Sequence, residues 1–195
     1  MNKRPLILIL SALPLGACMT MEGASDTGMR NSAMSDSVTV GGAAMYANRT
    51  IVANAVNSAD HTILVAAVKA AGLVDTLNSA GPFTVFAPTN AAFAALPAGT
   101  VDSLLLPQNK AMLQSVLTYH VVPGRLTASD LVRQIRAGGG SARLTTVQGG
   151  VLTAQMSGSQ VILIDAKGNA ATVTQADVLQ SNGVIHVTNK VSLPG

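Results

Sequence analysis

The sequence predicts an α+β domain, with helices mainly in its N-terminal half and strands mainly in its C-terminal half. In the first half, apolar residues such as Leu64, Val68 and Ala71 recur at the spacing of one helix face. The second half contains short apolar runs separated by turn compositions such as Lys167-Gly168-Asn169. A domain of about 150 residues buries roughly 70% of its extended-chain surface, so one stable core is expected.

Residues 1–17 have the organisation of a lipoprotein signal peptide. Lys3 and Arg4 form a positive start, and the apolar stretch from Leu6 to Leu15 is too short to span a bilayer. The stretch leads into Leu15-Gly16-Ala17-Cys18, which resembles a bacterial lipobox, where the Cys thiol receives the lipid. We predict cleavage before Cys18 and lipidation of its thiol. An ordinary secreted protein with an incidental Cys is the alternative.

A lipid on Cys18 would anchor the chain in the membrane of the cell envelope, since each buried methylene contributes about 0.8 kcal/mol. Met19 follows in place of an Asp, and by resemblance to lipoprotein sorting in Gram-negative bacteria this favours the outer membrane. Because Cys18 is the only Cys, the chain forms no internal disulfide and depends on its core for stability.

The charge balance argues against nucleic acid as a partner. Removal of Lys3 and Arg4 with the signal peptide leaves ten basic and nine acidic residues, a net charge of +1. The remaining charges are scattered and aromatic residues are few, so no nucleic-acid surface is expected.

Residues 18–42 are rich in Ser, Gly, Met, Thr and Asp and have neither helical nor strand periodicity, so we predict a flexible tether. Met19, Met21, Met29 and Met34 could be Cu(I) ligands, but their spacing is irregular and no His accompanies them. We interpret them as part of a solvated linker. The globular domain is expected to cover residues 43–195.

The domain is expected to open with short helices. Asn48 or Thr50 can cap the first through a side-chain oxygen, and Ser58 or Asp60 can cap the second. His61 lies near the start of the second helix, and we expect it to be solvated.

The stretch from Gly81 to Pro97 reads as strand, turn and helix, and it contains all three Phe residues of the chain. Phe83 and Val85 would face one side of the strand, with Thr84 and Phe86 on the other. Because the run is short and mostly apolar, we predict a buried strand.

Pro88 ends this predicted strand, because it restricts the residue before it and cannot donate a hydrogen bond. Thr89 or Asn90 can then cap a short helix. Phe93 and Leu96, three residues apart, give that helix an apolar face.

A later helix carries His120 on its apolar face, because Leu113, Val116, Leu117 and His120 fall at i, i+3, i+4 and i+7. We expect a buried, neutral imidazole bonded to a backbone carbonyl or a nearby hydroxyl. A recognition or catalytic histidine is the alternative.

Thr127 and Asp130 resemble a capping box for a helix that runs to about Arg136. The remaining chain is predicted to form strands at residues 143–147, 150–156, 160–165, 170–174 and 183–191.

The turn Asn182-Gly183 delivers the last strand, which we expect beside the strand at residues 83–86. Ile185 and Val187 share one face of it, so His186 points to the other face.

Three of these stretches together resemble the fasciclin (FAS1) domain family. They are TVFAPTNAAF in the first Phe-rich stretch, the pair Tyr119-His120 in LTYHVVPG, and NGVIHVTNKVSLP near the C-terminus. The order and spacing also fit, and the resemblance covers roughly residues 43–194. It implies a wedge of two β-sheets with several helices packed on one side. In animal relatives the Tyr-His region is linked to integrin-mediated adhesion, so Tyr119 and His120 become possible interaction residues.

No catalytic constellation is evident in the sequence. There is no GxSxG elbow, no close pair of carboxylates and no glycine-rich loop that opens a helix after a strand. The three His residues are too widely separated to give a metal-ligand spacing. We expect neither an enzyme nor a bound metal or cofactor.

Two functions remain. The first is a lipid-anchored adhesion or interaction module that binds a protein, matrix or polysaccharide through an exposed face, as a monomeric domain. The second is a lipid-anchored carrier that holds a small apolar, carotenoid-like ligand in a groove between sheet and helices. An adhesion module would show a closed core and an exposed apolar or mixed patch, whereas a carrier would show an apolar cleft.

Overall fold

The computed structural model describes residues 37–195, and its secondary structure confirms the α+β class. The predicted signal peptide, Cys18 and most of the predicted tether lie outside these residues. The described strands are β1 (Ser37–Val40), β2 (Ala43–Tyr46), β3 (Phe83–Pro88), β4 (Val121–Pro123), β5 (Ser141–Thr145), β6 (Val151–Ser157), β7 (Gln160–Ile164), β8 (Ala170–Gln180) and β9 (Gly183–Thr188).

The described helices all lie before residue 140. They are α1 (Ile51–Ala55), α2 (Thr62–Ala71), α3 (Val74–Asn78), α4 (Asn90–Ala94), α5 (Thr100–Leu105), α6 (Lys110–Tyr119) and α7 (Ala128–Ala137), with 3-10 turns at Ala59–His61 and Pro107–Asn109. Within residues 37–195 no helix combines the length and the apolar character needed to cross a bilayer.

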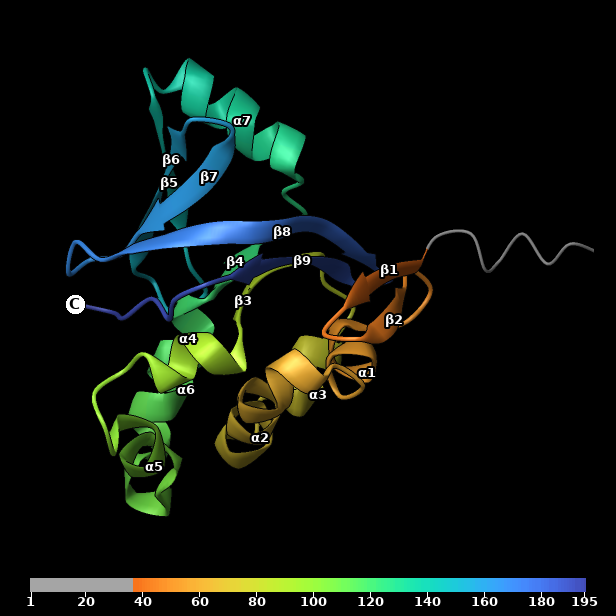
Figure 1. The fold of residues 1–195 in the computed structure, drawn as a ribbon, viewed down its shortest axis with the longest axis vertical. Helices are drawn as coiled ribbons and strands as arrows, with labels where there is room; N and C mark the ends of the chain where they lie inside the picture. The colour runs from red at the N-terminus through yellow and green to blue at the C-terminus, as the bar shows by residue number, and fades with distance from the viewer. Residues whose placement is uncertain (1–36) are drawn as a thin grey trace, which may run out of the picture. The chain divides into compact units, whose positions relative to one another are not determined.

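Seven of the strands form one mixed sheet in the order β4-β3-β9-β8-β7-β6-β5, while β1 and β2 form a separate hairpin (Figure 1). The pairing of β3 with β9 is parallel and places Phe86 opposite His186, as predicted for the last strand. The other pairs in the sheet are antiparallel.

Strand β8 is longer than predicted, because it continues past Thr174 to Gln180. Two register shifts against β9, on either side of Gln175, let β8 bend between the two halves of the sheet. Asp177 lies in this bulged region with φ of 57°, the left-handed region that non-glycine residues rarely adopt. The polar residues of the bulge break the alternation of apolar side chains, so the sequence suggested an earlier end.

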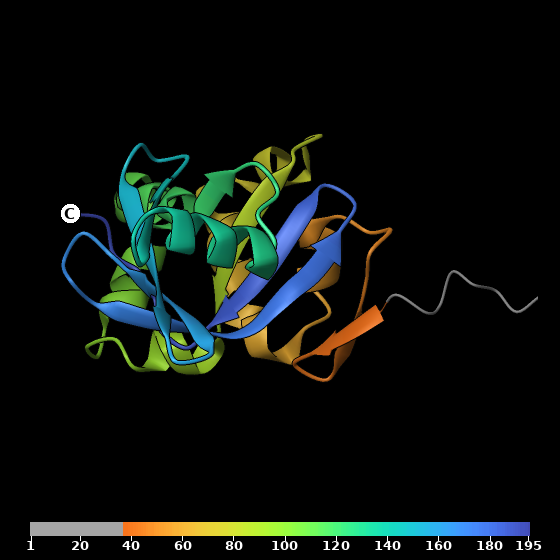
Figure 2. The same cartoon turned by 90° about the horizontal axis from the view of Figure 1, so that it is seen from above.

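The central strands are buried on both faces, which explains their continuous apolar sequence. Helices α1 to α6 cover one face, where Val85 and Ile185 join the larger apolar cluster. Helix α7 covers the strands β5 to β7 on the other face, where Phe86 and Leu131 belong to a second cluster (Figure 2).

The tether was predicted to extend to residue 42, but β1 begins at Ser37 and pairs with β2. Val40 is buried, and its carbonyl oxygen accepts a hydrogen bond from Ser58 Oγ at 3.2 Å. The Gln175 side chain also donates to the Thr39 carbonyl at 3.1 Å. These contacts come from residues distant in the sequence, so the local composition could not reveal them.

Candidate functional site

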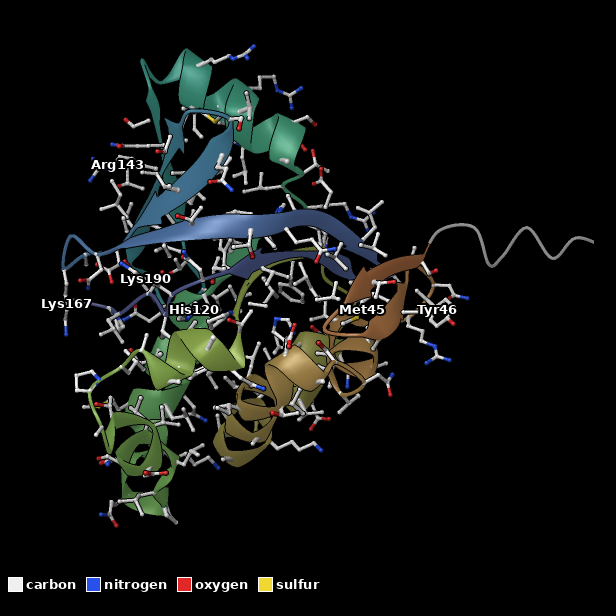
Figure 3. The ribbon with its side chains drawn as sticks, viewed as in Figure 1. Met45, Tyr46, His120, Arg143, Lys167 and Lys190 are labelled. Carbon is white, nitrogen blue, oxygen red and sulfur yellow. The ribbon has the colours of Figure 1, made fainter. Side chains whose placement is uncertain are left out.

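The Tyr119-His120 pair lies at the C-terminal end of α6. His120 is labelled in Figure 3, where this helix meets the sheet. Leu113, Val116 and Leu117 bury the apolar face of α6, as their spacing predicts. Tyr119 is 0% exposed and His120 only 4% exposed. Neither side chain therefore forms part of the surface that a partner protein could contact directly.

His120 joins α6 to the C-terminal segment. Its Nδ1 lies 2.7 Å from the Val116 carbonyl oxygen, and its Nε2 lies 2.9 Å from the backbone nitrogen of Ser192. Nδ1 must therefore carry the proton and donate, while Nε2 accepts from the Ser192 N–H. The hydrogen bond to a backbone carbonyl agrees with the predicted structural histidine. Burial lowers the pKa of His120, which keeps the imidazole neutral at neutral pH.

Tyr119 joins α6 to the second half of the sheet. Its hydroxyl donates to the Val151 carbonyl at 2.8 Å and accepts from the Ala166 N–H at 3.0 Å. Burial raises the pKa of this phenol. Gly150 lies so close to the ring that an added Cβ would stand 2.6 Å from a ring carbon. Tyr119 and His120 thus join α6 to the second half of the sheet and to the C-terminal segment.

Asp165 completes this junction, and the sequence analysis did not identify it. Its carboxylate accepts from the backbone N–H groups of Leu193 at 2.9 Å, Lys167 at 3.0 Å and Asn169 at 2.8 Å. Burial alone would raise the pKa of Asp165, but these hydrogen bonds outweigh it and hold the pKa below its usual value. An Asp before the turn Lys167-Gly168-Asn169 indicates hydrogen bonds to the backbone of that turn. Nothing in the local sequence indicates the hydrogen bond to Leu193.

His186 lies in β9 and is 0% exposed. Its Nε2–H donates to the Leu126 carbonyl at 2.7 Å, and its Nδ1 accepts from the Asp177 N–H at 3.3 Å. The ring stacks on Phe86 at 5.6 Å between centroids, and burial lowers its pKa. His186 and Phe86 thus lie on the face opposite that of Ile185, as the alternation predicts.

The turn Asn182-Gly183 connects the sheet with the helical layer. Asn182 Oδ1 accepts from the Ile51 N–H at 3.0 Å, and its Nδ2 donates to the Leu77 carbonyl at 2.6 Å. A Cβ on Gly183 would lie 2.1 Å from the Phe83 carbonyl oxygen, so only Gly fits against β3.

After Pro88, Thr89 and Asn90 were both candidates to cap the short helix α4, and the structure distinguishes them. Thr89 caps α4, because its side chain accepts from the Ala92 N–H at 3.3 Å. Asn90 instead binds the start of α2: its Oδ1 accepts from the Ile63 N–H at 3.0 Å and its Nδ2 donates to the Ala59 carbonyl at 2.8 Å. Phe93 is buried in the helical core.

His61 is 3% exposed, which corrects the expectation of a solvated side chain. Its Nδ1 lies 2.9 Å from Ser58 Oγ, and its Nε2 has no hydrogen-bond partner. Burial lowers its pKa more than the nearby Asp60 raises it. Val40 and Met45, from the β1–β2 hairpin that the sequence did not predict, border the same small cavity as His61.

An apolar groove of about 50 Å³ lies between α1, α2 and α3 on one side and β3 and the end of α6 on the other. Half-buried Val52, Val65 and Val74 contribute to its lining, and Phe83 and His120 reach it from the sheet side. Lys69 is the one charged residue that lines it. The groove is the kind of feature expected of a carrier, although its volume is small.

The described residues contain no group of three or more His, Cys, Asp or Glu side chains that could hold a metal ion. His61, His120 and His186 lie in three different hydrogen-bonding environments. The site is therefore a set of buried polar contacts that join helices to the sheet, beside an apolar groove.

Comparison with known protein sequences gives three findings. The profile of a family described as Fasciclin domain matches residues 59–194. Protein sll1483 of Synechocystis is 51% identical over 158 residues, which cover 81% of either chain. The cell surface glycolipoprotein MPB83 of Mycobacterium bovis is 54% identical over 59 residues, or 30% of this chain and 26% of that protein.

Among solved structures, the fold matches a FAS1 domain pair from the insect cell adhesion molecule Fasciclin I. The TM-score is 0.65 at 20% sequence identity, and the match covers 73% of this chain and 50% of that chain. At this identity, the likeness concerns the fold.

Proposed function

Because the chain belongs to the fasciclin (FAS1) domain family, we propose that it is an interaction module of the cell envelope that binds a protein, matrix or polysaccharide partner. Fasciclin domains are non-enzymatic, adhesion-type modules. The insect relative with the same fold is a cell adhesion molecule by name. The module would act as a monomer through one exposed face.

The observation that carries this proposal is the exposure of apolar side chains around the turn between α5 and α6. Leu106 is 43% exposed and Met112 is 61% exposed, and Pro107 lies between them in the chain, exposed as well. Burial of Tyr119 and His120 excludes them from direct contact, so an interaction surface has to be sought among exposed side chains such as these.

We further propose that a lipid on Cys18 holds the module at the outer membrane. The lipobox and Met19 support this anchor, as does the similarity to a cell surface glycolipoprotein. The parent chain should incorporate a labelled fatty acid in cells, and a Cys18→Ser variant should not. Equal labelling of both chains, or of neither, would argue against the lipid anchor.

The interaction is tested by capture of native cell-envelope material on the full chain, followed by analysis of bound protein and polysaccharide. Leu106→Asp should reduce capture of the bound species severalfold, since a charge would disrupt an apolar contact. Leu179→Asp is the matched control, because Leu179 is 42% exposed but lies on β8. Equal loss in both variants, or in neither, would contradict the proposed surface.

The apolar groove supports a second candidate, a carrier of a small apolar ligand. A carrier should yield an extractable apolar molecule when the full chain is purified from its native cells. An extract free of apolar molecules, together with captured polysaccharide or protein, would favour the interaction module.

A further inference from the structure

We propose that the apolar groove binds a single-chain anionic amphiphile, a free fatty acid, with its carboxylate at Lys69 and its hydrocarbon chain between α2 and β3. This inference rests on the second candidate function and names its ligand class. It depends on the volume of the groove, the chemistry of its lining and the position of Lys69.

The volume favours a narrow ligand. The groove encloses about 50 Å³, and a single water needs roughly 10–15 Å³ on the same measure. This space admits part of one unbranched hydrocarbon chain. Val147, which is 44% exposed, also lines the groove, so the rest of the chain can continue along an apolar rim.

The lining excludes a ligand that is polar along its length. His120 is the one titratable ring in the lining, and both of its nitrogens are already bonded to Val116 and Ser192. The Thr118 hydroxyl is likewise bonded to the Gln114 carbonyl at 2.6 Å. Thr76, the other polar lining residue besides Lys69, is exposed, so the buried part of the groove matches a hydrocarbon chain.

Lys69 supplies charge complementarity for one end of the ligand. It lies in the last turn of α2, is exposed, and is the one charged residue in the lining. Within residues 37–195 the observed ion pair joins Arg133 to Asp130 and leaves Lys69 available. A cation in the last turn of a helix interacts favourably with the helix dipole, and Lys69 occupies such a position in α2. This interaction does not use the N–H donors of Lys69, so they are free to bind a carboxylate. Asp75 lies on α3, between two lining residues, without itself lining the groove.

The test is calorimetric titration of the mature chain, residues 18–195, made without the signal peptide and carrying Cys18→Ser, so that neither the lipid nor the apolar segment Leu6–Leu15 is present and the protein can be purified without detergent. The probes are dodecanoate, dodecan-1-ol and dodecyltrimethylammonium, each below its micellar concentration. Dodecanoate should bind with one-to-one stoichiometry and more tightly than the cationic probe. Lys69→Ala should weaken dodecanoate binding about two- to fivefold and leave dodecan-1-ol binding unchanged. Lys190→Ala, outside the groove, is the control.

Two variants test the location. Val65→Trp fills the groove and should abolish binding, whereas Val56→Trp places the same side chain at a position that is 46% exposed and outside the lining. If Val65→Trp does not fold by circular dichroism, Val52→Trp fills the same space from α1. Binding that survives a folded groove-filling variant would overturn the site.

The remaining outcomes separate this inference from the functions it rests on. Equal binding of all three probes, unaffected by Lys69→Ala, would overturn the anionic ligand and leave the carrier. Failure of every probe to bind would overturn the fatty-acid site, and the extraction from native cells would then decide separately whether the chain is a carrier. The interaction module would then depend on its own capture experiment.

Discussion

The imidazole of His120 accepts a hydrogen bond from the backbone N–H of Ser192, 72 residues away in the sequence, at 2.9 Å. Its other nitrogen donates to the Val116 carbonyl within α6. A single neutral side chain therefore fixes the end of a helix to the C-terminal segment. Leu193, the next residue, is held by Asp165, so two acid-sensitive groups retain the same segment.

We predict that His120→Ala lowers the free energy of unfolding by about 2–4 kcal/mol, because it leaves a cavity and an unsatisfied Ser192 N–H. Urea denaturation followed by circular dichroism measures the loss. His120→Gln, which can restore part of the hydrogen bonding, should lose less. If His120→Ala left stability unchanged and abolished partner capture, His120 would be a recognition residue instead.

Stability should fall on acidification below about pH 6.5. Burial lowers the pKa of His61, His120 and His186 from the ordinary value of 6.5, so below that pH the unfolded chain binds more protons than the folded one. The contribution of the neutral histidines to the free energy of unfolding is complete above pH 6.5. It is lost as the pH falls, by up to about 1.4 kcal/mol per pH unit for each His.

Urea denaturation between pH 7.5 and pH 5 measures this slope. His120→Gln should reduce it by about one third, since one of three similar groups is removed. A flat profile over this range would show that the three histidines do not remain neutral in the fold.

Phe86→Ala should cost about 3–5 kcal/mol, the usual range for truncation of a core Phe. Phe86 is 0% exposed and stacks on His186, so the variant loses both packing and ring contact. Phe83→Ala, at a half-buried position three residues earlier, is the matched control and should cost less. The comparison uses the midpoint of urea denaturation for both variants; equal costs would contradict the central role of Phe86.

Asn90→Ala should cost about 1–2 kcal/mol, because α2 loses the side-chain cap that it receives at Ile63. Thermal unfolding detects such a change. Asn48→Ala, at an exposed position, should stay within about 0.5 kcal/mol of the parent chain. An unchanged melting temperature for Asn90→Ala would mean that α2 does not need this cap.

Local sequence patterns gave most elements of the fold. The helical spacing of Leu113, Val116 and Leu117 identified α6, and the capping box of Thr127 and Asp130 identified the start of α7. These features depend on contacts within a few residues, so composition and spacing are enough to reveal them. Strand β1 and the extension of β8 each pair with the next strand in the chain, yet both were missed. Strand β1 has only four residues, and the polar residues of the bulge interrupt the apolar alternation of β8.

The candidate site was predictable in part. The apolar spacing around His120 indicated burial, but the sequence could not identify Ser192 or Asp165 as parts of the same junction. His61 was expected in solvent because it lies near a helix start, but it is buried beside a small cavity that the β1–β2 hairpin also borders. No sequence pattern indicated that Lys69 would line a groove, because the groove depends on how α2, β3 and α6 pack.

The sequence by itself determined the α+β class, the buried Phe-rich strand and the helices that carry an apolar face. Those features follow from apolar periodicity and from turn residues, which act over short distances. Only the tertiary structure decided which donors meet the buried histidines and where an apolar groove remains open. Hydrogen bonds such as His120 to Ser192 and cavities such as the groove depend on the packing of distant segments, and no local pattern encodes that packing.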